Sequence, residues 1–248
     1  MFLFQCINMT ETLTILDITR LIVGIAILSY ASYTDIKTRR ASNILWFIMG
    51  SIGAILILIQ FITIGFGDKI NYLIFIPIMI GFVYLLFQLR LIFGGADAKA
   101  LMAIAILVPL EPDFLQFPIW SGSLMPSSWY IFSNSVIIFL LFPISLLIYN
   151  IIKRNISFPF CLLGYKMSVK KAREKFVWPL EKLVDGKRKF VYMPKEFDIE
   201  KELEEFENQN IKDIWVTPKI PFMIPLLAGF IIAFIFGDIM FFIMSLFM

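Results

Sequence analysis

The sequence predicts an all-α membrane protein with six transmembrane helices and a small cytoplasmic α+β insertion before the last helix. Two compositional observations support this class: 59% of the 248 residues are hydrophobic and only 17% are charged. Soluble chains run nearer to roughly 45–50% apolar and about 25% charged residues. The third observation is the order of the segments, because five apolar stretches precede a single long polar region, residues 154–218, and one follows it.

The predicted spans are assigned by length, since crossing the hydrocarbon core of a bilayer takes about 20 mostly apolar residues. The six spans are residues 13–33, 44–66, 70–93, 98–110, 129–152 and 220–248. The first carries Asp17 and Arg20 as its only charges, three residues apart, so that they can pair on one helix face. The second and fifth are uncharged, the third holds Arg90 near its end, and the sixth contains Asp238. The fourth is apolar but short.

Lysine and arginine are distributed unevenly between the two sides of these spans. With six crossings, all of the 22 basic residues except Arg20 and Lys69 lie on one side. The positive-inside rule places that side in the cytoplasm and both termini outside. The connection 111–128 agrees with this orientation, because it contains neither lysine nor arginine.

The polar region 154–218 is predicted to fold as a small cytoplasmic α+β domain. It contains lysine-rich stretches, a hairpin turn at Asp185-Gly186 and an acidic helix over 199–208. A hydrophobic core of this size gives only marginal stability, so we expect the domain to pack against the membrane domain or lipid headgroups. The predicted division is thus a membrane domain over 1–153, the soluble domain over 154–218, and the last helix over 219–248.

Several classes of chemistry are excluded by composition. Histidine is absent, which excludes His-ligated metal sites, nucleophiles activated by His and HExxH metalloproteases. The two cysteines, Cys6 and Cys161, form no CxxC pair, and no Gly-rich dinucleotide fingerprint is present. We therefore expect neither a metal nor a cofactor, and any acid–base chemistry has to come from Asp, Glu, Lys or Tyr.

Two aspartates stand out among the acids outside the polar region, because only Asp35 and Asp97 lie at the cytoplasmic end of a predicted span. Asp35 directly follows the first span and Asp97 opens the fourth. Thirteen residues of helix measure about 20 Å, against a hydrocarbon layer of about 30 Å, so Asp97 is expected below the cytoplasmic surface. The preceding Gly94 and Gly95 would permit an irregular backbone there.

A pair of neighbouring carboxyl groups suits aspartyl proteolysis. Two carboxylates about 3 Å apart share one proton, so one can act as general base on a water while the other polarises the scissile carbonyl. Antiparallel packing of the spans can bring Asp35 and Asp97 together. This chemistry requires no histidine, metal or cofactor.

Structural and non-proteolytic interpretations remain open at this point. Asp97 would also serve as the N-cap of the fourth span, and Lys99 would then only offset its charge. Asp35 would equally balance the basic residues that follow it, namely Lys37, Arg39 and Arg40. At the level of function, intramembrane acids also suit a proton- or cation-coupled transporter, and the charged domain suits a non-catalytic assembly protein.

Both aspartates lie in local sequences that resemble known motifs. Residues 35–43, D-I-K-T-R-R-A-S-N, resemble the first aspartate motif of prepilin peptidases, in which Asp is followed by basic residues and the motif ends in a helix-starting Asn. Residues 94–99, G-G-A-D-A-K, resemble their second motif, G-x-G-D-x-K, with Ala96 in place of the second glycine. Together the motifs resemble those of the GxGD intramembrane aspartyl proteases. Six spans with a cytoplasmic insertion before the last resemble most the archaeal preflagellin (prearchaellin) peptidases.

The resemblance implies an endopeptidase that removes a short basic leader from preflagellin or related type IV pilin-like precursors at the cytoplasmic membrane face, with an archaeal prepilin peptidase of different substrate range as the alternative. The implied catalytic residues are Asp35 and Asp97, supported by Gly94, Gly95, Ala96 and Lys99. The expected partners are the precursor peptide and membrane lipid, with no nucleic acid. Bacterial relatives that also methylate their product commonly carry an extra Cys-containing region, which is absent here, so we expect peptidase activity only.

Overall fold

The computed structural model describes residues 2–89, 91, 94–123, 125–175, 177–184, 186–191, 199–219 and 221–247, without the side chains of residues 2–9 and 68. The described chain is mostly helical and has a small α+β region near its C-terminus. It divides into two compact units. The first comprises Met1–Phe139 and Pro221–Met248, and the second is Leu140–Ile220.

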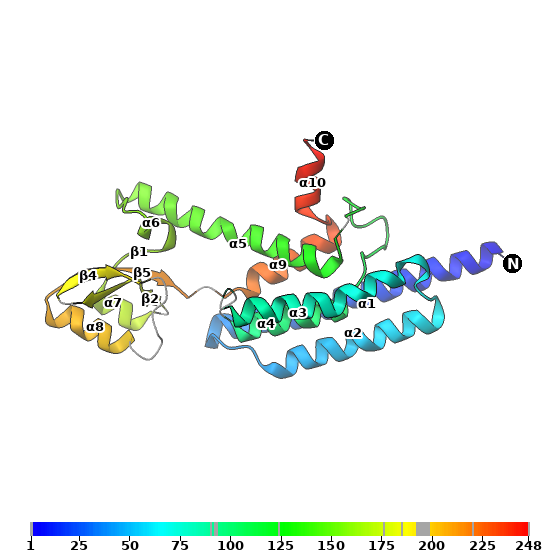
Figure 1. Ribbon diagram of the computed structural model, residues 1–248, viewed down its shortest axis with the longest axis horizontal. Helices are drawn as coiled ribbons and strands as arrows, with labels where there is room; N and C mark the ends of the chain where they lie inside the picture. Colours follow the sequence, from blue (N-terminus) through cyan, green and yellow to red (C-terminus); the bar gives the residue numbers. More distant parts are fainter. Residues whose placement is uncertain are drawn as a thin grey trace. The chain divides into compact units, whose positions relative to one another are not determined.

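The first unit is built from apolar helices. Its elements are α1 (Phe2–Thr38), α2 (Asn43–Thr63), the 3-10 helix η1 (Gly67–Ile74), α3 (Phe75–Gln88), α4 (Gly95–Leu107), the first half of α5 (Ser127–Ile152), α9 (Met223–Ile235) and α10 (Ile239–Ser245). The helices α1 to α4 run alongside one another (Figure 1), with α4 packed against both α2 and α3, and α1 packed against α2 and α9.

Helix α4 lies in the core of this unit. Buried residues occur on all sides of it: Ala98, Ala100, Leu101, Ala103, Ile104, Ala105 and Leu107. A helix that is apolar all round is one that neighbours cover all round. Its many alanines let those neighbours approach closely, and at Gly53 of α2 an added Cβ would lie 2.7 Å from the Cα of Leu107. The predicted fourth span is therefore rich in small side chains because it lies at the centre of the bundle.

Four helical segments among the described residues are long and apolar enough to cross a membrane. They are Thr10–Thr38, Asn43–Thr63, Lys69–Gln88 and Ser127–Ile152. Their outward faces carry large exposed apolar side chains such as Phe47, Leu58 and Ile78, which is the pattern that lipid contact requires. Helix α9 is apolar as well but has only 13 residues, the same length as α4.

The last predicted span is broken in two. The sequence predicts one helix over 220–248, and this prediction is wrong, because α9 and α10 are separate helices. At the break, Gly237 adopts a φ of +97°, in the left-handed region that glycine enters readily. The carboxylate of Asp238 then caps α10 by accepting hydrogen bonds from the amide N–H groups of Met240 (2.9 Å) and Phe241 (3.2 Å).

A loop from elsewhere in the chain fixes this break. The amide N–H groups of Ile119 and Trp120 donate to the carbonyls of Ile235 (3.0 Å) and Phe236 (2.8 Å). These are carbonyls at the end of α9, which a continuous helix would use internally. The long-range pairing replaces the lost helical bonds and so stabilises the interruption.

The second unit contains a three-stranded antiparallel sheet and a separate hairpin. The sheet has the order β1 (Tyr165–Ser168), β5 (Asp213–Pro218), β2 (Val177–Pro179), and the hairpin pairs β3 (Glu181–Val184) with β4 (Lys187–Phe190). The helices are α6 (Phe160–Leu163), α7 (Val169–Glu174) and α8 (Ile199–Asn208). The predicted hairpin and acidic helix are thus confirmed, with Gly186 at φ +72° in the turn, while Asp185 lies outside the described residues.

The core of the second unit comes from both helix and sheet. Leu203 and Phe206 of α8 pack with Ile214 and Val216 of β5. At the other end of the unit, Asn150 of α5 holds α6, because its Nδ2 donates to the carbonyls of Cys161 (3.0 Å) and Gly164 (2.7 Å). The end of α5 and the small α+β fold are therefore tied together by buried hydrogen bonds.

Candidate active site

Asp35 lies in the last turn of α1, a little further inside the helix than the sequence predicts. The predicted first span ends at Tyr33, but α1 continues to Thr38. Lys37 occupies the last turn, where a cation complements the helix dipole. The helix ends where Arg39 adopts a φ of +54°. The Asp35 side chain is half-buried.

Asp97 lies in the first turn of α4 and is also half-buried. It is not the N-cap, because that position is held by Gly94, which has no side chain; as an acid in the first turn it still complements the helix dipole. The carboxylate folds back over this glycine, and a Cβ built on Gly94 would collide with Oδ2 of Asp97. A Cβ on Gly95 would meet only the ring of Phe87 at 3.6 Å, an ordinary contact. Gly94 is therefore the glycine on which the position of the Asp97 carboxylate depends.

Ala96, where the resembled motif has glycine, sits in helical conformation in the first turn of α4. The backbone at this position has no need of the left-handed region that only glycine enters readily. The departure from G-x-G-D is thus compatible with the geometry around Asp97.

The two aspartates are brought into electrostatic range of each other. Asp35 is close enough for its charge to influence the carboxyl group of Asp97, and α1 packs against α4. Of the basic residues near Asp35, Arg39 acts on its carboxyl group electrostatically, whereas Lys37 lies over the ring of Tyr33 at 4.6 Å. Asp35 therefore lies within electrostatic range of both a cation and a second acid.

Lys99 connects the two motifs. Its Nζ donates a 2.8 Å hydrogen bond to Oδ1 of Asn43, the first residue of α2. Asn43 is also the last residue of the first motif, and it begins the helix that follows Asp35. The interpretation of Lys99 as a simple counter-charge to Asp97 misses this contact, which holds the beginnings of α2 and α4 together.

A second polar cluster lies at the other end of α4, and most of it was missed by sequence reasoning. The predicted pair is present, with Nη1 of Arg20 at 2.6 Å from Oδ1 of Asp17. Arg20 also donates to Oε1 of Gln60 (2.7 Å), and Asp17 accepts from the amide N–H of Asp113 (2.9 Å). No local pattern marks Gln60 or the Asp113 amide, because both reach the pair only through tertiary packing.

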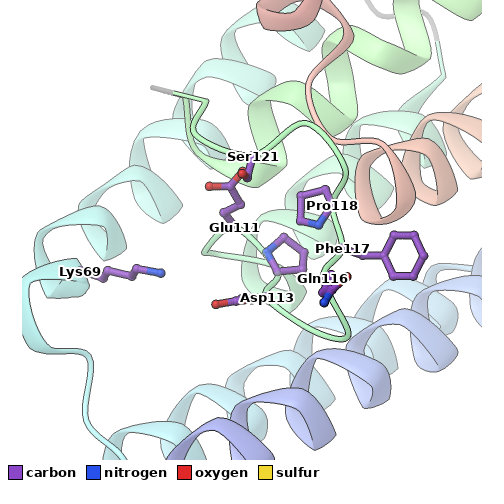
Figure 2. Close-up of a pocket in the computed structure, with 8 residues that line it drawn as sticks. Lys69, Glu111, Asp113, Gln116, Phe117, Pro118 and Ser121 are labelled. Carbon is purple, nitrogen blue, oxygen red and sulfur yellow. The ribbon is translucent and has the colours of Figure 1, made fainter.

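An open pocket adjoins this cluster (Figure 2). It is lined by Lys69, Glu111, Pro112, Asp113, Gln116, Phe117, Pro118 and Ser121. Lys69 extends from η1 toward Glu111 and Asp113. Burial raises the pKa of Glu111, while the amide N–H of Gly122 and the charge of Lys69 oppose this rise. The pocket begins only beyond the C-terminal end of α4, so it is separate from the site around Asp97.

Residues able to hold a metal are not gathered in the described part of the chain, where no group of three or more Cys, Asp or Glu side chains is arranged around a common point. Apolar helices packed around α4, four of them with long segments apolar enough to cross a bilayer, define a helical membrane protein. The chain belongs to the type IV leader peptidase family, whose model matches residues 22–152, a stretch that includes both aspartates. It is accordingly a protease. A second model, the archaeal peptidase A24 C-terminus type II, matches residues 157–239.

Curated relatives cover nearly the same extent. A preflagellin peptidase of Methanococcus voltae is 29% identical over 87% of this chain and 94% of its own length. A preflagellin peptidase of Methanococcus maripaludis is 28% identical over 88% of this chain and 94% of its own length. A preflagellin peptidase of Methanocaldococcus jannaschii is 26% identical over 88% of this chain and 93% of its own length.

Proposed function

We propose that this protein is a GxGD-type aspartyl endopeptidase embedded in the cell membrane, which removes the leader peptide from preflagellin or related pilin-like precursors. The observation that supports the proposal most is that Asp35 in the last turn of α1 is close enough for its charge to influence Asp97 in the first turn of α4. Membership of the leader peptidase family and the names of the relatives supply the substrate class.

The proposal includes a topology of six crossings. Helices α4 and α9 then lie in the membrane beside the four longer candidate spans. All but two of the 22 basic residues fall on one side, which becomes the cytoplasmic side with both termini outside. The membrane domain comprises residues 1–153 and 219–248, and residues 154–218 form the cytoplasmic domain. The leader of a precursor inserted from the cytoplasm would meet the aspartates at that face.

The proposed mechanism uses one proton shared by the two carboxyl groups. The ionised aspartate takes a proton from a water molecule as the water attacks the scissile carbonyl, and the protonated aspartate donates to the carbonyl oxygen. Collapse of the tetrahedral intermediate returns a proton to the leaving amine. In this mechanism the two carboxyl groups titrate as a pair, and neither residue is assigned alone to the acid or base role.

The supporting residues have distinct proposed roles. Gly94 leaves room for the Asp97 carboxylate, and Lys99 holds the beginning of α4 against α2 through Asn43. Gly95 and Ala96 form the first turn that presents Asp97. None of these residues takes part in proton transfer in this scheme.

The decisive test is leader cleavage by the full chain reconstituted in lipid, with preflagellin as substrate and pilin-like precursors for comparison. Asp35→Asn and Asp97→Asn should each lower kcat by at least about 10³-fold, as removal of one member of a cooperating acid–base pair does. Asp213→Asn is the matched control, since Asp213 is exposed in β5, and it should cleave normally.

Other outcomes would contradict the proposal. Full cleavage by either Asn variant would remove that aspartate from the mechanism. Ion flux into proteoliposomes that depends on Asp35 or Asp97, without any peptide cleavage, would favour a transporter. Cleavage of pilin-like precursors in preference to preflagellin would keep the mechanism and change the substrate assignment.

A further inference from the structure

The β3–β4 hairpin of the second unit carries a lysine face. Residues directly opposite in its register are Lys182 with Lys189 and Val184 with Lys187. Side chains alternate between the two faces of a strand, so Lys187 and Lys189 lie on the same face as Lys182. All three lysines are exposed. We call this set, Lys182, Lys187 and Lys189, the lysine face.

The lysine face is not neutralised within the described part of the chain. Like charges directly opposite each other destabilise a strand pair, and no ion pair joins these three lysines to a described acid. The nearby Glu181 points to the other face, where it accepts a 3.0 Å hydrogen bond from the amide N–H of Trp215 and lies 3.8 Å from Arg188. The hairpin therefore presents three concentrated positive charges to whatever lies outside it.

The hairpin is attached to the segment that follows a membrane-spanning helix. The candidate span of α5 ends at Ile152, and eight residues later the ring of Phe160 packs on Phe190 of β4, with ring centroids 5.0 Å apart. Phe160 also stacks on Trp215 at 5.5 Å. These contacts lie within one compact unit, so the hairpin remains close to the end of the span.

The connecting segment itself has the composition of a membrane interface. Lys153 and Arg154 follow the span and are exposed. Ile156 and Phe158 come next, with 66% and 80% of their surface exposed. Cations beside exposed apolar side chains, immediately after a membrane span, match the headgroup layer, in which apolar groups insert and cations meet phosphates.

We propose that the lysine face docks on anionic lipid headgroups of the leaflet in which α5 ends, the leaflet that Lys153 and Arg154 also meet. The partner is a lipid surface because the cations continue a membrane span and adjoin apolar side chains suited to the interface. Near an anionic bilayer each lysine contributes about fivefold to the equilibrium constant for surface association. Docking would restrain the small domain at the membrane, and it does not depend on the peptidase activity proposed above.

Hydrogen exchange of the full chain in lipid nanodiscs tests this docking. Nanodiscs of phosphatidylcholine alone are compared with nanodiscs that contain phosphatidylglycerol in addition. Amides of 180–191 should exchange several-fold more slowly in the anionic nanodiscs, and salt should abolish the difference because exposed charges are screened. The triple variant Lys182→Gln, Lys187→Gln and Lys189→Gln should lose the difference without salt.

A matched control distinguishes this surface from net charge. The triple variant Lys170→Gln, Lys171→Gln and Lys175→Gln removes three exposed lysines from the same unit and should keep the lipid-dependent protection. Equal exchange of the wild-type hairpin in the two nanodiscs would show that the lysine face contacts protein or solvent and not lipid, and it would overturn the proposal. If the hairpin variant fails to fold, the salt series on the wild type still tests the docking, because protection that persists at high salt would contradict an electrostatic contact with lipid.

Discussion

Lys99 Nζ donates a 2.8 Å hydrogen bond to Oδ1 of Asn43, a residue 56 positions away in the chain. The bond joins the end of one aspartate motif to the end of the other. Asn43 begins α2, which follows Asp35 after a short turn, and Lys99 stands two residues after Asp97. A contact between these residues therefore restrains the separation of the two carboxyl groups without involving either of them.

The first prediction concerns this bond. Asn43→Ala and Lys99→Met should each reduce kcat for leader cleavage about fivefold, because the bond is exposed and a hydrogen bond of this kind contributes about 1 kcal/mol. The double variant should be little worse than either single variant, since both remove the same contact. Cleavage rates of all four proteins give the coupling. Strictly additive losses would show that the two side chains act independently.

The second prediction concerns the glycine that faces Asp97. Gly94→Ala should lower kcat about tenfold to a hundredfold while the melting temperature changes little, because its Cβ displaces the flexible carboxylate and a misplacement of about 1 Å has effects of this size. Gly95→Ala is the matched control, since its Cβ meets only ordinary contacts, and it should cleave within about twofold of the wild type. Equal activity of the two variants would show that the Asp97 position does not depend on Gly94.

Local sequence predicts most of the helices, because apolar length and the scarcity of charges are properties of a window of residues. It fails at the last span, where hydropathy stays high across Gly237 although the helix stops. What ends the helix there is a left-handed glycine together with backbone pairing to Trp120, and the second of these is a tertiary contact. The local signal, a glycine followed by a capping aspartate, is present in the sequence, but two residues change little in the mean hydropathy of a window as long as a span.

The candidate site divides in the same way. Asp35 and Asp97 are candidates from the sequence alone, because a histidine-free membrane protein has few acids and the sequence shows that these two lie at the ends of predicted spans. The bond between Asn43 and Lys99 cannot be predicted from the sequence, because Asn43 is explained locally as a helix start and Lys99 as a counter-charge. The role of Gln60 likewise cannot be predicted from its sequence neighbours, since its partner Arg20 lies 40 residues away.

The third prediction concerns the buried pair of Arg20 and Asp17. Breaking a buried pair leaves one uncompensated charge, so Arg20→Met should lower the free energy of unfolding by about 3–5 kcal/mol. Asp17→Asn with Arg20→Met should restore part of this loss, because neither charge then remains. Thermal unfolding in detergent measures the effect. A double variant less stable than Arg20→Met would contradict the view that the remaining charge causes the loss.

The last prediction concerns pH and Glu111. Burial raises the pKa of this carboxyl group above its ordinary value of 4.5, so the folded protein holds the proton more tightly than the unfolded chain does. The contribution of Glu111 to stability is then present at low pH and falls as pH rises through the folded pKa. Glu111→Gln keeps an oxygen for the Gly122 amide but cannot ionise. Its melting temperature should therefore fall less than that of the wild type as pH is raised from about 4 to 7.

Glu11→Gln makes the same charge change at an exposed position of α1 and serves as control. Parallel pH curves for wild type and Glu111→Gln would show that Glu111 ionises equally in the folded and unfolded chain.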